Sequence, residues 1–307
     1  MSSSLENIIK LPLIESAIEI QFTKVFSEKL KKILNHNYFL RAQQNARKIT
    51  VYEIRYRSNG HLVGGYILQP RNNRKQLPVI IANRGGYKDF GDFRHGRVFN
   101  ELGNMAQWGY SVFASQLSGS RMSEGEDEFG GKDVDDIINL YDIIRAYHYA
   151  DEKRIGMYGH SRGAMMAFLC LRRVSWLRAL VCIAGPTNML RLLQLRPELK
   201  KALRDSNALS REWMEKRSAL FWTKKLPKRT PILLMHGTAD WRVTPIDSLE
   251  FSTKLLEHKV PHRLVLFEGA DHALSEFTQE YFQEMKKWFD RYVKDGLQLP
   301  NLTPHGE

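Results

Sequence analysis

The decapeptide Arg154-Ile-Gly-Met-Tyr-Gly-His-Ser-Arg-Gly163 contains the pattern Gly-x-Ser-x-Gly, with Gly159, Ser161 and Gly163 at its fixed positions. An apolar run leads into the pattern, and residues 164–171 after it have the composition of a buried helix. This context predicts a nucleophile elbow, a cramped strand-to-helix turn on which the serine hydroxyl projects above a sheet. Glycine suits both flanking positions because a side chain there would collide across so tight a turn. A plain loop is the alternative for the five residues alone.

Composition places the chain among ordinary globular proteins. Its 307 residues, 43% of them hydrophobic, suffice for one large α/β domain or two small ones. The formal net charge of +12 brings acidic partners, nucleic acid and anionic membrane surfaces into consideration. Basic residues gather at 71–75 and 191–229, but without the interleaved aromatic residues or the motifs of a nucleic-acid-binding protein. We therefore expect a solvated basic surface and no nucleic-acid partner.

The cysteines and the N-terminus indicate the compartment. Cys170 and Cys182 both lie in apolar runs, which predicts buried thiols rather than a disulfide framework or a zinc site. Residues 1–6 lack the basic start and apolar core of a signal peptide, and no run approaches the length of a membrane span. We expect a cytoplasmic protein without stable membrane insertion, and without a metal or cofactor.

The first 48 residues differ from the rest, and we expect a helical extension there. Apolar residues recur at helical spacing, which predicts one amphipathic helix docked on the main domain; they are Ile18, Phe22, Val25, Phe26, Leu30, Ile33 and Leu34. A helix on a membrane surface is the alternative, but Glu15, Glu19 and Glu28 argue against it. Residues 49–294 then form the main domain, and 295–307 a loose tail.

The main domain alternates strands and helices, which predicts an α/β fold with a mainly parallel sheet and helices on both faces. An antiparallel start is expected because Ser58-Asn-Gly60 between two β-rich runs is typical of a hairpin. We expect about eight strands, at residues 50–57, 62–69, 78–82, 110–114, 154–158, 179–184, 232–235 and 263–267. Helices are expected at 134–149, after the elbow, at 246–256 and at 277–292. Asp133, Asp135 and Asp136 are interpreted as helix-start residues.

Residues 186–230 interrupt this alternation with Leu- and Arg-rich helical sequence. Their place between two strands predicts a small lid over the site, and a packed helical insertion is the alternative. Trp213 and Trp222 in this segment, and Tyr87 elsewhere, are candidate substrate contacts.

A serine hydroxyl needs a histidine to take its proton and a carboxylate to hold that histidine. In this kind of fold the chain order is serine, acid, histidine. Asp240 follows the strand at 232–235, and His272 follows the strand at 263–267, so each lies just beyond the carboxyl end of its own strand. His160 and His236 compete for the role of base, but the first adjoins the serine and the second precedes the acid. Asp271 is interpreted as a loop residue.

An oxyanion needs two N–H donors. One is expected from the backbone of Arg162, directly after the serine, and the other from the loop after the strand at 78–82. That loop contains a pair of glycines, of which Gly86 is the predicted donor and Gly85 the near alternative.

Together these motifs resemble the catalytic domain of the prolyl oligopeptidase family of serine peptidases, within the α/β-hydrolase superfamily. The similarity covers residues 50–294, including the hairpin, Arg84-Gly-Gly86, Gly130-Gly-Lys-Asp-Val134, Gly159-His-Ser-Arg-Gly163, His236-Gly-Thr-Ala-Asp240 and Asp271-His272. The resemblance implies Ser161 as nucleophile, Asp240 as acid and His272 as base. Family peptidases usually carry an N-terminal β-propeller, which the first 48 residues cannot form, and some place a tyrosine before the glycine pair where this chain has Arg84.

Three functions remain open at this point. One is a peptidase acting on short peptides or aminoacyl derivatives, the second an esterase acting on small acyl esters, and the third a non-catalytic binding module. The complete set of Ser161, Asp240 and His272 disfavours the third function. Peptidase and esterase share the acyl-enzyme chemistry, so the sequence does not separate them.

Overall fold

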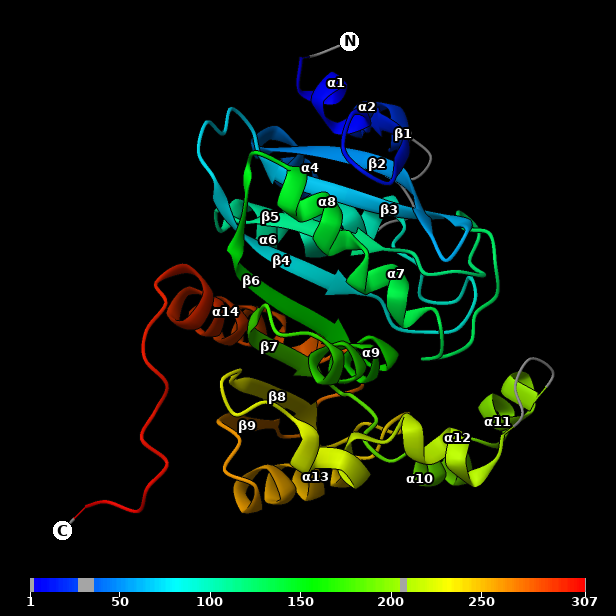
Figure 1. The fold of residues 1–307 in the computed structure, drawn as a ribbon, viewed down its shortest axis with the longest axis vertical. Helices are drawn as coiled ribbons and strands as arrows, with labels where there is room; N and C mark the ends of the chain where they lie inside the picture. The colour runs from blue at the N-terminus through cyan, green and yellow to red at the C-terminus, as the bar shows by residue number, and fades with distance from the viewer. Residues whose placement is uncertain (1–2, 27–35, 205–208, 307) are drawn as a thin grey trace. The chain divides into compact units, whose positions relative to one another are not determined.

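The computed structural model describes residues 3–26, 36–204 and 209–306. These residues form a nine-stranded, mostly parallel sheet with the order β1-β2-β3-β5-β4-β6-β7-β8-β9 (Figure 1). The chain divides into two compact units, Met1–Asp127 with Lys132–Ile155, and Glu128–Gly131 with Gly156–Glu307. Strand β6 (Ala150–His160) begins in the first unit and ends in the second. The expected α/β architecture is confirmed, with one strand more than the sequence predicted.

The first unit contains the antiparallel start of the sheet. Strand β2 pairs antiparallel with β3, β3 antiparallel with β5, and β4 parallel with β5. The β2–β3 hairpin turns at Asn59 and Gly60, whose φ angles of 51° and 81° are those of the turn that the sequence predicted. The bounds of these strands are β2 Ile49–Ser58, β3 His61–Pro70, β4 Leu77–Asn83 and β5 Ser111–Ser115.

The N-terminal segment is not one amphipathic helix, and that prediction was wrong. Residues Ile14–Glu19 form strand β1, which pairs antiparallel with β2 at the edge of the sheet. Pairing satisfies the backbone of this segment, and Arg57 forms an ion pair with Glu15 across the two strands at 2.8 Å. The helices of this segment are separate from one another, namely α1 Ser3–Ile9, α2 Phe22–Val25 and α4 His36–Lys48. The predicted helix positions Leu30, Ile33 and Leu34 lie outside the described residues.

The expected helix at 134–149 is two helices, α7 (Val134–Ile138) and α8 (Leu140–Ala146). Asp136 does more than start a helix, which corrects its interpretation from sequence. Its side chain is fully buried, and Oδ2 accepts hydrogen bonds from the backbone N–H and the hydroxyl of Ser118 at 2.7 and 2.8 Å. Three further helical segments complete this unit: α5 His95–Arg97, the π-helix η1 Val98–Leu102 and α6 Gly103–Gln107.

The second unit holds three parallel strands and their helices. Strand β7 pairs parallel with β8, and β8 parallel with β9. Helices α9 and α13 lie together, with the rings of Phe168 and Phe251 4.9 Å apart, while Phe289 of α14 packs against Gly156 of β6. The main elements are β7 Leu177–Ile183, β8 Ile232–Gly237, β9 His262–Phe267, α9 Arg162–Arg173, α13 Ile246–Glu257 and α14 Thr278–Phe289. Short helical segments η3 Ser275–Phe277 and η4 Asp290–Lys294 flank α14.

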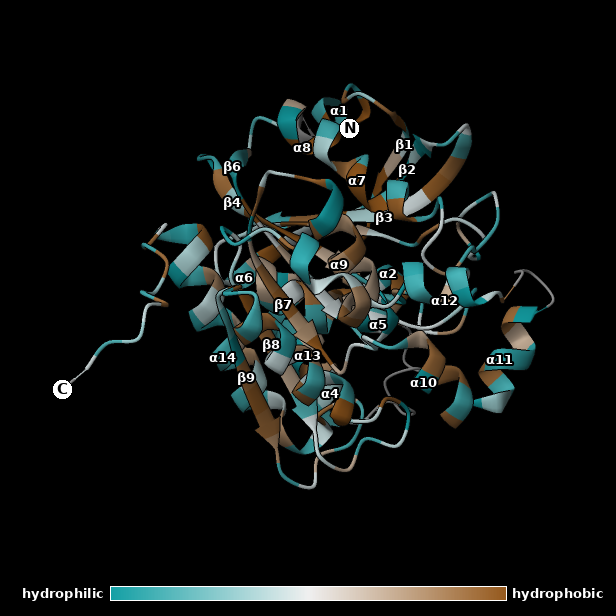
Figure 2. Ribbon diagram, turned by 60° about the horizontal axis from the view of Figure 1, so that its bottom comes forward, coloured by the Kyte–Doolittle hydropathy of each residue, from teal (hydrophilic) through white to brown (hydrophobic). Residues whose placement is uncertain are grey.

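The described residues within 186–230 are largely helical, and their role as a lid stays a prediction; Figure 2 shows the apolar character of α10 and the hydrophilic character of α12. The insertion is anchored at its start by Asp247 of α13. The Asp247 Oδ2 accepts the N–H groups of Thr187 and Asn188 at 2.8 and 3.0 Å, and Oδ1 pairs with Arg191 at 2.8 Å. Its helices are α10 Met189–Leu195, α11 Pro197–Arg204, α12 Arg211–Lys216 and the 3-10 helix η2 Ala219–Lys225.

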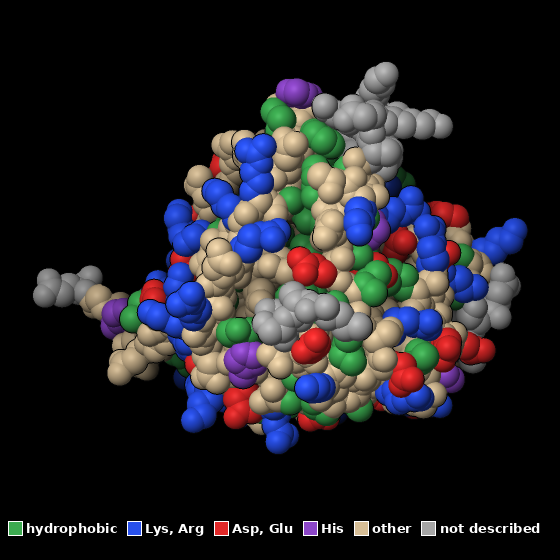
Figure 3. All heavy atoms as spheres, turned by 90° about the horizontal axis from the view of Figure 1, so that it is seen from above, with side chains coloured by type: hydrophobic (Ala, Val, Ile, Leu, Met, Phe, Trp, Pro, Cys, Tyr) green, Lys and Arg blue, Asp and Glu red, His purple; other side chains and the backbone are tan. Residues whose placement is uncertain are grey.

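The surface and the thiols agree with the composition. Lys and Arg side chains are spread over the face shown in Figure 3, among acidic side chains. Cys170 and Cys182 are buried free thiols, and burial raises the pKa of Cys182 well above its usual value. Among the described residues, no helix has the length and apolar character needed to cross a membrane.

Candidate active site

Ser161 occupies a strained turn between β6 and α9. Its φ of 57° and ψ of −126° fall in a region that residues other than glycine rarely adopt, so the backbone turns sharply at the serine. The backbone N–H of Ser161 donates to the carbonyl of Ile183 at the end of β7, at 2.8 Å. A Cβ atom on Gly159 would lie 2.2 Å from the carbonyl oxygen of Gly163, so position 159 requires glycine. This geometry is that of the predicted elbow.

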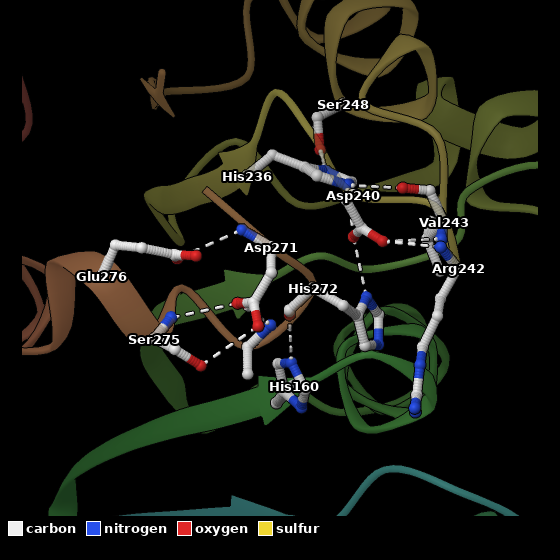
Figure 4. Close-up of polar contacts among 11 residues, drawn as sticks. His160, His236, Asp240, Arg242, Val243, Ser248, Asp271, His272, Ser275 and Glu276 are labelled. Carbon is white, nitrogen blue, oxygen red and sulfur yellow. Dashed lines mark hydrogen bonds and ion pairs between the residues drawn. The ribbon is translucent and has the colours of Figure 1, made fainter. Parts of the chain in front are cut away.

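Asp240 and His272 meet beyond the carboxyl ends of β8 and β9. The Nδ1 atom of His272 lies 2.7 Å from Oδ2 of Asp240 (Figure 4). The two loops approach closely, because a Cβ atom on Gly237 would lie 2.3 Å from the carbonyl oxygen of Ala270. The acid and the histidine predicted from their strand ends are therefore hydrogen-bonded partners.

The loop of His272 also contacts the elbow. Nε2 of His160 lies 2.8 Å from the carbonyl oxygen of His272, and the two rings have centroids 4.9 Å apart. Since His160 immediately precedes Ser161, these contacts bring the His272 loop to the turn that carries the serine. All three predicted triad residues therefore lie at one edge of the second unit.

Asp240 is held as an anion by its hydrogen bonds. Only 6% of the residue is exposed. Its Oδ1 accepts the N–H groups of Arg242 and Val243 at 2.8 and 3.0 Å. Burial alone would raise the pKa of Asp240, but hydrogen bonds from His236 and His272 outweigh that effect and hold the pKa well below its usual range. The carboxylate is thus ionised and able to orient the imidazole of His272.

The other candidate residues for base and acid have different partners: Nε2 of His160 contacts the backbone carbonyl of His272. His236 is fully buried on the far side of Asp240 from His272, as Figure 4 shows. Asp271 binds its own loop, accepting the N–H groups of Ala273 and Ser275 at 2.9 and 3.0 Å. Hydrogen bonds within this loop lower the pKa of Asp271 although its partial burial acts in the opposite direction. The interpretation of Asp271 as a loop residue is confirmed.

A group of aromatic and arginine side chains connects the helical insertion to Arg162, the residue after Ser161. The guanidinium of the buried Arg162 lies over the ring of Phe129, with 4.6 Å from its carbon to the centroid, and Trp213 stacks on Phe129 at 6.5 Å. Arg217 donates to the carbonyls of Phe129, Glu128 and Trp213 at 2.8 to 3.1 Å. Trp213 of the insertion is therefore one ring away from the residue that follows Ser161.

Trp222 is not brought to the site. It is 5% exposed, and the guanidinium carbon of Arg172 lies 4.5 Å from its ring centroid, at the end of α9 opposite to Ser161. Its selection as a substrate contact is therefore corrected, because the ring packs inside the second unit.

Gly86 and Tyr87 belong to the first unit, so their roles at the site stay predictions. Gly86 has a φ of 77°, and a Cβ atom there would lie 1.8 Å from the carbonyl oxygen of Phe90, so the turn itself requires glycine. The buried Arg84 holds this turn by donating to the carbonyls of Gln116, Gly85, Phe90 and Lys88. Arg84 thus has a structural task at the position where some family members carry a tyrosine.

Two residues directly after the acid were missed from sequence. Trp241 is 68% exposed, and the guanidinium carbons of Arg196 and Arg242 lie 4.9 and 5.2 Å from its ring centroid. The backbone N–H of Arg242 binds Oδ1 of Asp240 at 2.8 Å (Figure 4). The only feature of the sequence that could have indicated these two residues is their position directly after Asp240. Within the described ranges, no three His, Cys, Asp or Glu side chains are grouped so as to hold a metal ion.

Comparison with known proteins agrees with the α/β fold. The sequence profile of the prolyl oligopeptidase family matches residues 97–296. The uncharacterized peptidase YtmA of Bacillus subtilis is 27% identical over 220 residues, which cover 70% of this chain and 83% of that protein. Dipeptidyl-peptidase 5 of Schizosaccharomyces pombe is 24% identical over 78% of this chain, but only 37% of its own length is covered. The structure of the Pyrococcus horikoshii acylaminoacyl peptidase superposes with a TM-score of 0.73 at 22% identity, covering 88% of this chain and 46% of that one.

Proposed function

The chain belongs to the prolyl oligopeptidase family, and on that premise we propose that it is a serine peptidase that cleaves short peptides or aminoacyl derivatives through an acyl-enzyme. The observation that supports this most is the joint placement of Ser161, Asp240 and His272. A strained serine turn, a histidine whose loop contacts that turn, and an ionised carboxylate on the histidine are the parts that acyl transfer requires.

In the proposed reaction His272 acts as the base. Because its Nδ1 faces the carboxylate of Asp240, the hydrogen of the neutral ring lies on Nδ1 and the lone pair on Nε2. Nε2 takes the proton of the Ser161 hydroxyl as the oxygen attacks the substrate carbonyl. The same proton then passes to the leaving amine as the carbon–nitrogen bond breaks. A water molecule, deprotonated by His272, hydrolyses the acyl-enzyme and regenerates the serine.

The oxyanion of the intermediate needs two donors. The backbone N–H of Arg162 stands at the start of the twelve-residue helix α9, where helix N-termini favour negative charge. The second proposed donor is the N–H of Gly86, with Gly85 as the alternative. Both assignments rest on the expected geometry of the elbow and of the loop after β4.

Two observations support the proposed substrate class: the names of the relatives and a cation in the loop of the acid. The curated relatives named above are called peptidases, which favours an amide over an ester substrate. Arg242, whose backbone N–H binds Asp240, supplies a cation in the loop of the acid, and an arginine can bind a carbonyl or carboxylate oxygen of a short peptide. An esterase acting on small acyl esters is the second candidate, because it would use the same residues.

Activity-based labelling tests the chemistry. A fluorophosphonate probe should label the wild type and leave Ser161→Ala unlabelled; equal labelling of both proteins would refute the assignment of the nucleophile. A panel of aminoacyl amides, N-acyl aminoacyl amides and small acyl esters then separates the two candidates. Turnover of the amides supports the peptidase, whereas hydrolysis confined to esters supports the esterase.

A further inference from the structure

His236 is fully buried, yet the reaction proposed above gives it no task. It lies near the end of β8, and both of its ring nitrogens have partners (Figure 4). Nε2 lies 3.1 Å from Oδ2 of Asp240 and 2.9 Å from the carbonyl oxygen of Val243. Nδ1 lies 2.7 Å from the hydroxyl oxygen of Ser248 on α13.

These partners determine where the ring carries its hydrogen. A carboxylate and a carbonyl are acceptors only, so Nε2 facing both of them must be the donor. Nδ1 then accepts from the hydroxyl of Ser248, which can rotate to donate. A neutral ring satisfies all three contacts, and a neutral imidazole costs less to bury than an imidazolium.

Asp240 therefore receives two imidazole donors on one oxygen. Oδ2 is 3.1 Å from Nε2 of His236 and 2.7 Å from Nδ1 of His272. Asp240 itself lies on a loop, whereas His236 and Ser248 lie on a strand and a helix of the same unit. The N–H of His236, a residue of strand β8, thus fixes Oδ2 of Asp240, which is the same oxygen that contacts His272.

We propose that His236 is a positioning residue, whose Nε2–H holds Oδ2 of Asp240 in the place and ionisation state that His272 requires. This inference rests on the proposed function, because it needs Asp240 to act as the triad acid. It predicts a loss in turnover rather than in substrate affinity, since His236 acts through Asp240 and His272 instead of touching the substrate. A displacement of a catalytic group by about 1 Å costs on the order of 10²-fold in rate.

The dependence of activity on pH gives a second readout. The titratable groups in contact with Asp240 are His236 and His272, and Arg242 binds Asp240 through its backbone N–H. Asp271 precedes His272 in the chain but binds its own loop. On α13, Ser248 contacts His236, and the preceding residue Asp247 is paired with Arg191. Removal of the His236 donor leaves more negative charge on Oδ2 to stabilise the protonated form of His272. The low-pH limb of kcat/KM should therefore move to higher pH.

The experiment compares three substitutions in the full chain. His236→Leu removes the donor, His236→Gln places an amide N–H near the position of Nε2, and His236→Asn carries the same amide on a shorter side chain that does not reach Asp240. We expect kcat to fall by about 10²-fold in His236→Leu and His236→Asn with KM nearly unchanged. His236→Gln should recover most of the turnover and the wild-type pH limb. Melting temperatures of all variants control for folding.

The outcomes separate this inference from the proposed function. Turnover of His236→Leu within threefold of wild type, while Asp240→Asn is inactive, would overturn the positioning role and leave the triad intact. Should the Leu variant not fold, equal turnover of the Gln and Asn variants would overturn it instead. Equal activity of wild type and Ser161→Ala would show that the proposed function itself is wrong.

Discussion

The Nδ1 atom of His272 lies 2.7 Å from Oδ2 of Asp240, although Asp271 is the carboxylate adjacent to His272 in the chain. The carboxylate of Asp271 is taken up by the N–H groups of its own loop. Spatial placement at the ends of β8 and β9, rather than proximity in sequence, thus decides which carboxylate His272 contacts.

The first prediction concerns this choice of acid. Asp240→Asn keeps the shape but presents an amide N–H to His272, which reverses the tautomer that the reaction needs. Turnover should fall on the order of 10⁴-fold, whereas Asp271→Asn should change it little. Steady-state kinetics of the two variants on one substrate measure the difference. If Asp271→Asn were the crippling change, the acid would be assigned wrongly.

The strained backbone of Ser161 predicts an inverted order of stability between two inactive variants. At an ordinary position glycine is less stable than alanine by roughly 0.5–1 kcal/mol. At a φ of 57° and ψ of −126°, glycine avoids the strain that alanine keeps. Ser161→Gly should therefore be more stable than Ser161→Ala by about 1 kcal/mol. Denaturant unfolding of both proteins measures this, and a more stable alanine variant would contradict the strained turn.

Asp136 predicts a stability change with pH in the first unit. Burial raises the pKa of Asp136 from 3.8 to about 6, although hydrogen bonds from Ser58 and Ser118 act to lower it. The folded state therefore binds a proton more tightly than the unfolded state, and stability falls as pH rises from about 4 to about 6. Since Asp136→Asn lacks this titration, its stability relative to wild type should improve by about 2 kcal/mol between pH 4 and pH 7.

Unfolding free energies at both pH values test this expectation. Asp142→Asn serves as the matched control, because Asp142 is an exposed carboxylate on the next helix, α8. An equal response of the two variants to pH would show that Asp136 is not the group responsible.

The two tryptophans of the insertion should respond differently to alanine. Trp213 is separated from Arg162 only by the ring of Phe129. Trp213→Ala should therefore change the preference among acyl chain lengths more than it changes the rate of hydrolysis of an acetyl ester. Trp222 is only 5% exposed, so Trp222→Ala should instead lower the free energy of unfolding by about 3–5 kcal/mol, as truncation of large buried side chains does. Kinetics on an ester series and denaturant unfolding distinguish the two effects. Equal acyl preference in Trp213→Ala and wild type would leave Trp213 as a packing residue only.

The sequence was most informative where a local pattern has one structural solution. The elbow at Ser161 and the strand-end positions of Asp240 and His272 depend on short segments, and strand order then brings them together. Residues Ile14–Glu19 were misread because apolar residues at 18, 22, 25 and 26 fit a helical period, whereas pairing with β2 decides the conformation. Such pairing joins distant parts of the chain, so no window of the sequence contains it.

The contacts of buried polar side chains were also not predicted from the sequence. The sequence did not show that Arg84 and Arg217 bind backbone carbonyls inside their units. His236 was considered from the sequence only as a competitor for the base, and its contact with Asp240 was not foreseen. In each case the partners lie in loops, whose paths local propensity does not determine.

The second unit consists of two separate segments of the chain, Glu128–Gly131 and Gly156–Glu307, and Arg217 holds them together. Its guanidinium holds the carbonyls of Glu128 and Phe129, and Gly130 packs so tightly against α9 that a Cβ atom there would lie 2.9 Å from Leu169. A fragment cut at Gly156 would therefore lack four residues of its own packing and leave a buried cation without these carbonyls. Anyone who transplants this half of the protein into a chimera must supply Glu128–Gly131 as well, by circular permutation or as a separate peptide.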